Sequence, residues 1–165
     1  EEYGEVDLTV LAADAVADGR ARAPERVVRL VGIGTGVHPT PVAGSEARLR
    51  QVVTNLLANA LHHTPPGTPV EVAVGVTDGE AILEVRDHGP GIPDDLTGRV
   101  FERFYRTDPS RGRSQGGGNG LGLAIVAAIV AAHNGRVGVA ATPGGGATFV
   151  VRLPTANSQQ LVSRL

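Results

Sequence analysis

Residues 116–123 read Gly-Gly-Gly-Asn-Gly-Leu-Gly-Leu and run directly into an apolar segment, residues 124–132, with the composition of a buried helix. Five of the seven residues from Gly116 to Gly122 are glycine. Glycine lets a backbone approach an anion closely, and the free amides and positive dipole end of a following helix attract negative charge. The stretch predicts a phosphate-binding turn, but a glycine-rich turn before a helix is also typical of a flexible connection.

Two other phosphate-binding folds do not fit this stretch. No G-x-G-x-x-G spacing occurs between Gly116 and Leu123, which argues against a dinucleotide-binding fold. All 15 cationic side chains of the chain are arginine, so a P-loop, which requires lysine, is excluded.

The composition narrows the function classes. The chain has 165 residues, 41% of them hydrophobic, and a net charge of -2, which suits one domain with a proper core and predicts no nucleic-acid partner. It has no cysteine, which suits a reducing compartment. The longest apolar run, residues 121–132, is far shorter than the roughly 20 residues that span a bilayer. We therefore expect a cytoplasmic chain without direct membrane contact.

Hydrophobic periodicity outlines the elements around this stretch. Helices are expected over residues 7–18, from Ser45 through residue 60, and over the apolar segment before Asn134-Gly135. Two hairpins are expected, one from residues 70–76 and 81–85 around Asp78-Gly79 and one from residues 136–141 and 147–153, with a further strand over residues 26–33. Residues 88–118 lack a sustained period, apart from a short helix predicted over 99–106, which is typical of a functional lid. The chain from Pro154 onward is expected to fray.

Two polar constellations stand out on this outline. Asn55, Asn59 and His62 fall at i, i+4 and i+7 on one flank of the second helix, where a carboxamide oxygen could ligate a phosphate-held Mg²⁺ or simply face solvent. Asp87 follows the first hairpin and precedes Gly89 and Gly91. It could accept a hydrogen bond from an exocyclic amine such as that of adenine, or form an ordinary Asx turn.

Four motifs resemble, in order and spacing, the nucleotide-binding boxes of bacterial sensor histidine kinases. Residues 51–65 (QVVTNLLANALHHTP) are similar to the N box, residues 87–93 (DHGPGIP) to the first glycine box, residues 100–106 (VFERFYR) to the F box and residues 118–126 (GNGLGLAIV) to the second glycine box. Residues 144–149 and 152–154 look like the family's final strand. The match covers residues 6–154, which leaves residues 155–165 as a C-terminal tail.

The resemblance implies the catalytic and ATP-binding domain of such a kinase. Its expected fold is α+β, a two-layer sandwich of the GHKL (Bergerat) type in which a mixed sheet of about five strands is backed by three helices, with an ATP lid. Carried over position by position, Asn59 would ligate Mg²⁺, with Asn55 as a catalytic residue on the phosphate side. Asp87 would recognise the adenine amine, and Thr148 would support Asp87 from the last strand.

The remaining implied contacts fall on three segments. Gly89, Gly91 and Ile92 would shape the adenine pocket. In the lid, Phe101 and Phe104 would dock against the domain, and Arg103 or Arg106 would neutralise charge on the γ-phosphate. Backbone contacts to the phosphates would come from Gly118, Gly120, Leu121, Gly122 and Leu123.

His62 and His63 depart from the family pattern, which usually has a lysine and often a tyrosine at these positions. An imidazole is shorter than a lysine side chain and only partly charged near neutral pH. If His62 meets the phosphates, nucleotide affinity falls as the pH rises from about 6 to about 8. A zinc site is disfavoured, since helix neighbours point about 100° apart.

The phosphoacceptor is the second departure. None of the five histidines is followed by an acidic residue, as the family's acceptor histidine typically is. We therefore expect no autophosphorylation by this chain, whose acceptor would lie on a dimerisation domain in a longer protein or act in trans, upstream of a response regulator. In isolation the chain is expected to be a monomer.

Two alternatives stay open. A hydrolytic ATPase similar to gyrase or MutL, or an anti-sigma-type serine kinase, would carry a glutamate as general base where this chain has Asn55, which cannot accept a proton at neutral pH. A pseudo-enzyme that regulates through protein contact would explain His62 and His63, but the intact glycine boxes argue against complete decay.

Overall fold

The computed structural model describes residues 2–93, 100–101 and 122–158. In this part of the chain, strands and helices follow in the order β1 (Tyr3–Asp7), α1 (Leu8–Arg22), β2 (Val28–Gly32), β3 (Pro41–Ser45), α2 (Glu46–His62), β4 (Val70–Thr77), β5 (Glu80–Asp87), α4 (Gly122–Ala132), β6 (Arg136–Ala141) and β7 (Ala147–Pro154). Of the predicted lid, residues 88–118, the structure describes only 88–93 and 100–101, and of the short helix predicted over residues 99–106 only Val100 and Phe101.

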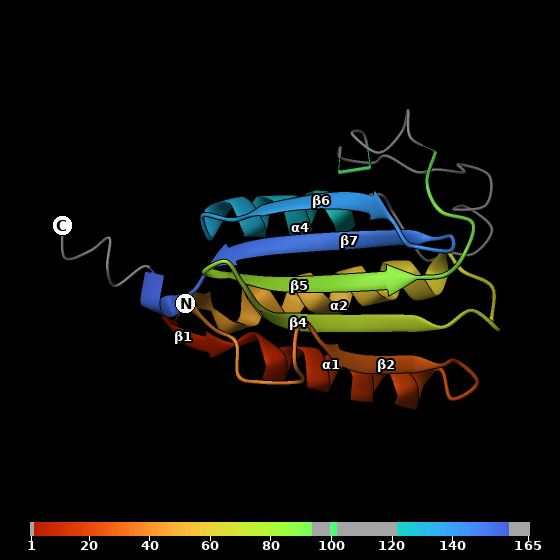
Figure 1. Ribbon diagram of the computed structural model, residues 1–165, viewed down its shortest axis with the longest axis horizontal. Coiled ribbons are helices and arrows are strands. Elements are labelled where there is room, and N and C mark those ends of the chain that lie inside the picture. The colour runs from red at the N-terminus through yellow and green to blue at the C-terminus, as the bar shows by residue number, and fades with distance from the viewer. Residues whose placement is uncertain (1, 94–99, 102–121, 159–165) are drawn as a thin grey trace.

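A five-stranded sheet forms one of the two layers. Its strand order is β2-β4-β5-β7-β6, with β2 and β4 parallel and the other neighbours antiparallel. The three described helices lie behind this sheet in the view of Figure 1. The predicted mixed sheet backed by three helices is therefore confirmed.

The core lies between these layers, because alternate residues of each strand face the helices. On the central strand β5, Ala81, Leu83 and Val85 are at most 1% exposed. The apolar stripe of α2 covers them, and all six of its predicted positions are buried: Leu49, Val52, Val53, Leu56, Leu57 and Ala60.

Local sequence signals set the bounds of several elements. The carboxylate of Asp7 caps α1 by accepting from the Thr9 N–H at 3.0 Å, and the Ser45 hydroxyl caps α2 by accepting from the Arg48 N–H. Asp78 and Gly79 both have positive φ, 53° and 77°, between the paired residues Thr77 and Glu80. This is the two-residue hairpin turn that the sequence predicts.

Three parts of the fold differ from the sequence prediction. β1 and β3 form a separate two-stranded antiparallel sheet that was not expected, since Gly44 and Pro41 weaken the strand pattern. Helix α1 continues to Arg22 rather than ending near residue 18. The chain after Pro154 does not fray at once. Thr155 and Ala156 are buried, and the Ser158 hydroxyl donates to the Gly79 carbonyl at 3.2 Å.

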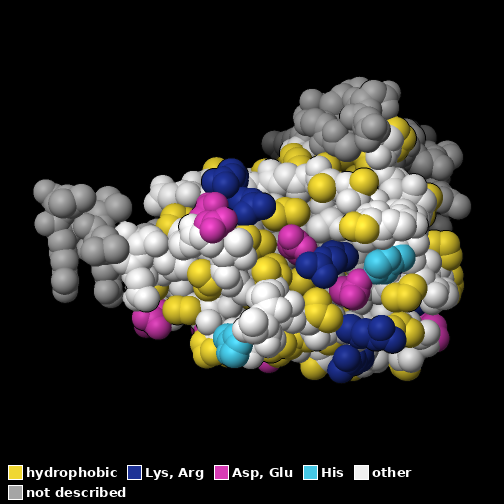
Figure 2. All heavy atoms as spheres, in the orientation of Figure 1, with side chains coloured by type: hydrophobic (Ala, Val, Ile, Leu, Met, Phe, Trp, Pro, Cys, Tyr) yellow, Lys and Arg dark blue, Asp and Glu magenta, His cyan; other side chains and the backbone are white. Residues whose placement is uncertain are grey.

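The sheet has one open face and a covered edge. Acidic and basic side chains lie next to one another on the open face in Figure 2, where the structure pairs Arg86 with Glu84 at 2.7 Å. At the β2 edge, the Arg20 Nε donates to the outward carbonyl of Val28 at 2.8 Å. No described helix is both long and apolar enough to cross a membrane.

Candidate functional site

One flank of α2 supplies the polar side chains at the helix side of the site. Asn55, Asn59 and His62 are half-buried there, at the spacing that places them on one stripe. Within the described part of the chain, neither carboxamide makes a hydrogen bond. His63 is exposed at the end of the helix, with its ring edge-on to that of His62 at 5.0 Å between centroids.

Asp87 ends β5 and is only 6% exposed. Its Oδ1 accepts two backbone hydrogen bonds, from Gly89 N at 3.0 Å and from Ala147 N at 3.1 Å. Its Oδ2 has no hydrogen-bond partner among the described residues. The carboxylate is thus fixed through one oxygen and leaves the other as an acceptor.

Three glycines make this fixation possible. A Cβ on Gly146, whose φ is 115°, would collide with the carbonyl oxygen of Asp87. A Cβ on Gly91, whose φ is 79°, would lie 3.2 Å from the Gly146 carbonyl oxygen, and one on Gly89 would lie 2.8 Å from the Thr64 methyl group. The β6–β7 turn and the Asp87 loop therefore pack backbone against backbone, and the Thr64 side chain packs against the Gly89 turn.

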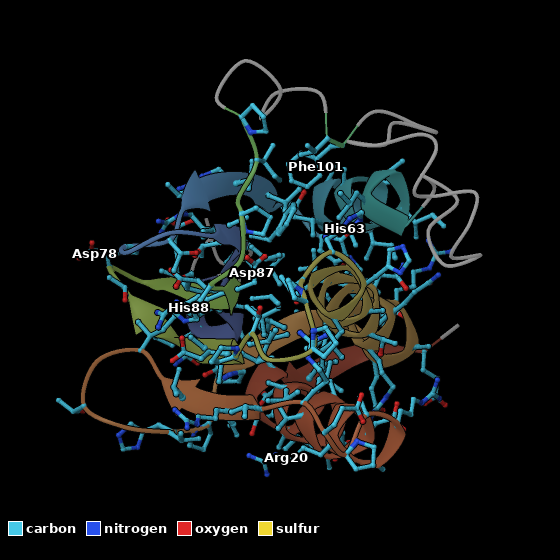
Figure 3. The ribbon with its side chains drawn as sticks, turned by 90° about the vertical axis from the view of Figure 1, so that its right-hand side faces the viewer. Arg20, His63, Asp78, Asp87, His88 and Phe101 are labelled. Carbon is cyan, nitrogen blue, oxygen red and sulfur yellow. The ribbon has the colours of Figure 1, made fainter. Side chains whose placement is uncertain are left out.

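Apolar residues close the site around Asp87. Ile92, Phe101 and Leu123 are partly buried and pack against the core. The Phe101 ring stands edge-on to Phe149 of β7, with centroids 5.8 Å apart and planes at 89°. In Figure 3, Asp87 lies between the sheet and the end of α2, with Phe101 above it, His63 on the helix side and His88 on the other side of the sheet.

The structure does not place the Thr148 side chain next to Asp87, where the sequence analysis expected it. Its hydroxyl is buried and pairs with the Thr142 hydroxyl at 2.9 Å rather than with Asp87. In the register, Thr148 lies opposite Arg86, so its side chain lies on the face of the sheet away from Asp87's side chain. The support from β7 comes instead from the backbone N–H of Ala147.

The other expected site residues lie in α4 or outside the described part of the chain. Gly122 is the first described residue of α4. The expected contacts of six further residues lie outside the described residues: Arg103, Phe104, Arg106, Gly118, Gly120 and Leu121.

The donor chemistry of the site fits a magnesium ion held together with phosphates. Mg²⁺ prefers oxygen ligands and keeps several waters, so a single carboxamide oxygen such as that of Asn59 is an adequate protein ligand. In the described ranges, no three histidine or carboxylate side chains gather into a metal cluster of their own.

A groove of about 460 Å³ lies between the first half of α2 and α4. It is lined by Ala47, Arg48, Gln51, Ile125, Ala128 and Ile129. Arg48 and Gln51 lie on the same face of α2 as Asn55, since residues three and four apart share a helix face. The groove therefore continues the polar stripe toward the start of α2, which the sequence motifs did not indicate.

Sequence reasoning also assigned no role to Arg26 or to the Thr64 side chain. The Arg26 guanidinium donates to the Thr64 hydroxyl at 2.6 Å, and Thr64 contacts the Gly89 turn. These residues are 38 positions apart. Only the three-dimensional structure reveals this contact, because no local sequence pattern links the two residues.

Comparisons with known proteins agree with this geometry. Residues 44–157 match the family described as histidine kinase-, DNA gyrase B- and HSP90-like ATPase. The chain is 48% identical to TcrY, a probable sensor histidine kinase of Mycobacterium tuberculosis, over 98% of this chain and 33% of that protein. Two solved structures are similar over nearly their whole length. The mycobacterial sensor histidine kinase MprB matches with a TM-score of 0.78 and 33% identity, over 93% of this chain and 97% of that one. The ATP-binding domain of PrrB from Mycobacterium tuberculosis matches with a TM-score of 0.74 and 29% identity, over 94% of this chain and 98% of that one.

The chain spans about a third of the length of TcrY. It corresponds to the ATPase catalytic domain of the sensor histidine kinases that it resembles. The family match covers residues 44–157, and the chain shares its fold with a solved histidine kinase structure. The chain therefore belongs to the histidine kinase-, DNA gyrase B- and HSP90-like ATPases.

Proposed function

We propose that this chain binds Mg-ATP and donates the γ-phosphoryl group to a histidine on a dimerisation and phosphoacceptor domain. The observation that carries the proposal is Asp87, a nearly buried carboxylate with one oxygen fixed by two backbone amides and the other left as an acceptor. PrrB, whose solved structure is an ATP-binding domain, shares the fold at 29% identity.

Asp87 recognises the adenine end of the nucleotide. Its Oδ2 accepts a hydrogen bond from the exocyclic amine, and a buried acceptor discriminates strongly against a base that cannot donate. Gly89 and Gly91 bring the backbone close to the base, and Ile92 follows them on the same loop after β5 and packs against the core.

Asn59 and Asn55 serve the phosphate end. Asn59 ligates Mg²⁺, which when bound neutralises charge on the phosphates. Asn55 orients the γ-phosphate, with His62 and His63 nearby on α2. The glycine turn before α4, together with Arg103 or Arg106, completes the positioning of the phosphates.

In the transfer step, the imidazole nitrogen of the acceptor histidine bonds to the γ-phosphorus as the bond to the β–γ bridging oxygen breaks, and ADP leaves. The acceptor lies in a longer protein in cis or on a partner in trans, and a response regulator receives the group next. TcrY is about three times as long as this chain and is named a probable sensor histidine kinase, which supports a catalytic role within a larger sensor.

Calorimetric titration with ATP, with and without Mg²⁺, tests the binding site. We expect micromolar affinity that weakens without the metal and in Asn59→Ala, and that is unchanged in Thr54→Ala, an exposed position on another face of α2. Transfer from γ-labelled ATP to an added phosphoacceptor domain then tests the kinase step. No heat at any ATP concentration would instead indicate a regulatory domain that acts by protein contact.

A further inference from the structure

We propose that Arg26 is a positioning residue of this site. It holds the C-terminal end of α2, which carries Asn59 and His62, against the Gly89 turn that fixes Asp87. The inference rests on the function proposed above, because it concerns how the two ends of the nucleotide pocket keep their separation.

Arg26 lies just before β2, and its terminal nitrogens reach across to the segment after α2. Nη1 donates to the Leu61 carbonyl at 3.0 Å and to the Thr64 carbonyl at 3.2 Å. Nη2 donates to the Thr64 hydroxyl at 2.6 Å and to the Thr68 carbonyl at 3.2 Å. One side chain thus binds four acceptors on residues 61–68.

The end of α2 needs such a partner. The last carbonyls of a helix have no intrahelical donor, and α2 is capped by His63, at φ -91°, rather than by the left-handed glycine that commonly supplies one. The Thr64 hydroxyl donates back to the Ala60 carbonyl at 2.7 Å, and Arg26 donates to that of Leu61. A fixed positive charge at this helix end also complements the helix dipole.

Thr64 connects the end of α2 to the Gly89 turn beside Asp87. Its methyl group lies against Gly89, where a Cβ would be only 2.8 Å from Thr64 Cγ2. Gly89 in turn donates its N–H to Asp87 Oδ1 at 3.0 Å. A displacement of Thr64 therefore moves the turn that orients the Asp87 carboxylate.

The planar guanidinium group of Arg26 suits this role, because its two terminal nitrogens bind four acceptors at once. Nε of Arg26 is buried without a hydrogen-bond partner among the described residues, so the two terminal nitrogens alone hold the segment. A lysine offers one nitrogen on a flexible stem and cannot span four acceptors in the same way. Arg26→Lys should therefore recover only part of the function that Arg26→Ala loses.

The experiment compares Arg26→Ala, Arg26→Lys and a matched control, Arg29→Ala. Arg29 lies three residues further on, in β2, is exposed and has no bonded partner in the described ranges. Affinity for Mg-ATP is measured well below each variant's unfolding temperature. Amide spectra of the nucleotide-free proteins report on Gly89 and Ala147, whose N–H groups bind Asp87.

We expect Arg26→Ala to shift both amide signals and weaken ATP binding about tenfold or more, with Arg26→Lys intermediate and Arg29→Ala within about twofold of the wild type. A folded Arg26→Ala protein with unmoved Gly89 and Ala147 signals and wild-type affinity would overturn the inference. If the wild type binds no ATP, the proposed function fails while the amide shifts still decide the role of Arg26.

A double-mutant cycle guards against loss of folding in Arg26→Ala. Thr64→Val removes the hydroxyl that accepts from Arg26 but keeps a methyl group against Gly89. Combined with Arg26→Lys, it should cost less than the sum of the single effects, because both changes break the hydrogen bond between Arg26 and the Thr64 hydroxyl. Additive effects on ATP affinity would show that Arg26 does not act through Thr64.

Discussion

The Nε2 atom of His133 accepts a hydrogen bond of 3.1 Å from the backbone N–H of Ser45, which lies 88 residues earlier. The Nδ1 of the same ring lies 2.8 Å from the Ile129 carbonyl oxygen, so Nδ1 carries the proton and donates there. The ring is 3% exposed and stacks on Tyr3 with centroids 5.6 Å apart. One neutral imidazole thus joins the end of α4 to the start of α2.

His133→Phe should keep the stacked ring but leave the buried Ser45 N–H without an acceptor. We expect the free energy of unfolding in urea to fall by about 1–3 kcal/mol. Tyr3→Ala is the control, since Tyr3 is 63% exposed and its loss removes only the stack. Equal effects of the two changes would mean that the hydrogen bond contributes little.

Gly146→Ala and Gly144→Ala separate backbone strain from close packing. Both glycines have positive φ, 115° and 87°, so each alanine costs about 1–3 kcal/mol of strain. Only at Gly146 does the new Cβ also meet the Asp87 carbonyl, whereas nothing lies within 4 Å at Gly144. We expect ATP affinity, measured on folded protein, to fall in Gly146→Ala alone. Parallel losses in both variants would contradict the packing argument.

Asp87→Asn should preserve the fold while changing base preference. An asparagine Oδ1 can still accept from Gly89 N and Ala147 N, but an NH₂ group replaces the free Oδ2 acceptor. We expect ATP affinity to fall about tenfold to a hundredfold, with inosine triphosphate, which carries a carbonyl in place of the amine, affected least. Equal losses for both nucleotides would remove Asp87 from base recognition.

His62→Gln tests whether the histidine of α2 meets the phosphates. A protonated imidazole attracts phosphate, so wild-type ATP affinity should fall between about pH 6 and about pH 8, and this slope should vanish in the variant. His88→Gln is the matched control, because His88 pairs with Glu71 at 2.7 Å on the other side of the sheet. A flat wild-type profile would place His62 outside the site.

The sequence predicts those parts of the fold that depend on local signals. Asp78-Gly79 encodes the first hairpin turn by its tolerance of positive φ, and the apolar spacing of α2 identifies its buried face. The pairing of β1 with β3 depends instead on contacts between segments on either side of α1, such as Gly4 opposite Gly44, 40 positions apart, which no local pattern encodes.

The candidate site likewise combines features that the sequence predicts with features that it does not. Asp87 and the asparagines of α2 stand in recognisable motifs, so their identity is predictable from the sequence. The hydrogen-bond partners are not. Ala147 supports Asp87 through a backbone amide whose donor is independent of residue type, and Arg26 reaches its acceptors only through the tertiary arrangement of β2 and α2.

The Arg20 contact at the edge of β2 bears on association between copies of this chain. An edge strand with free outward carbonyls and amides can template the addition of another strand and so lead to aggregation. Here the outward Val28 carbonyl is already occupied by the Arg20 side chain, and the Gly36 backbone lies directly against Gly32 at the other end of the strand. A second molecule would therefore find the two ends of the β2 edge already occupied, one by the Arg20 side chain and the other by the Gly36 backbone.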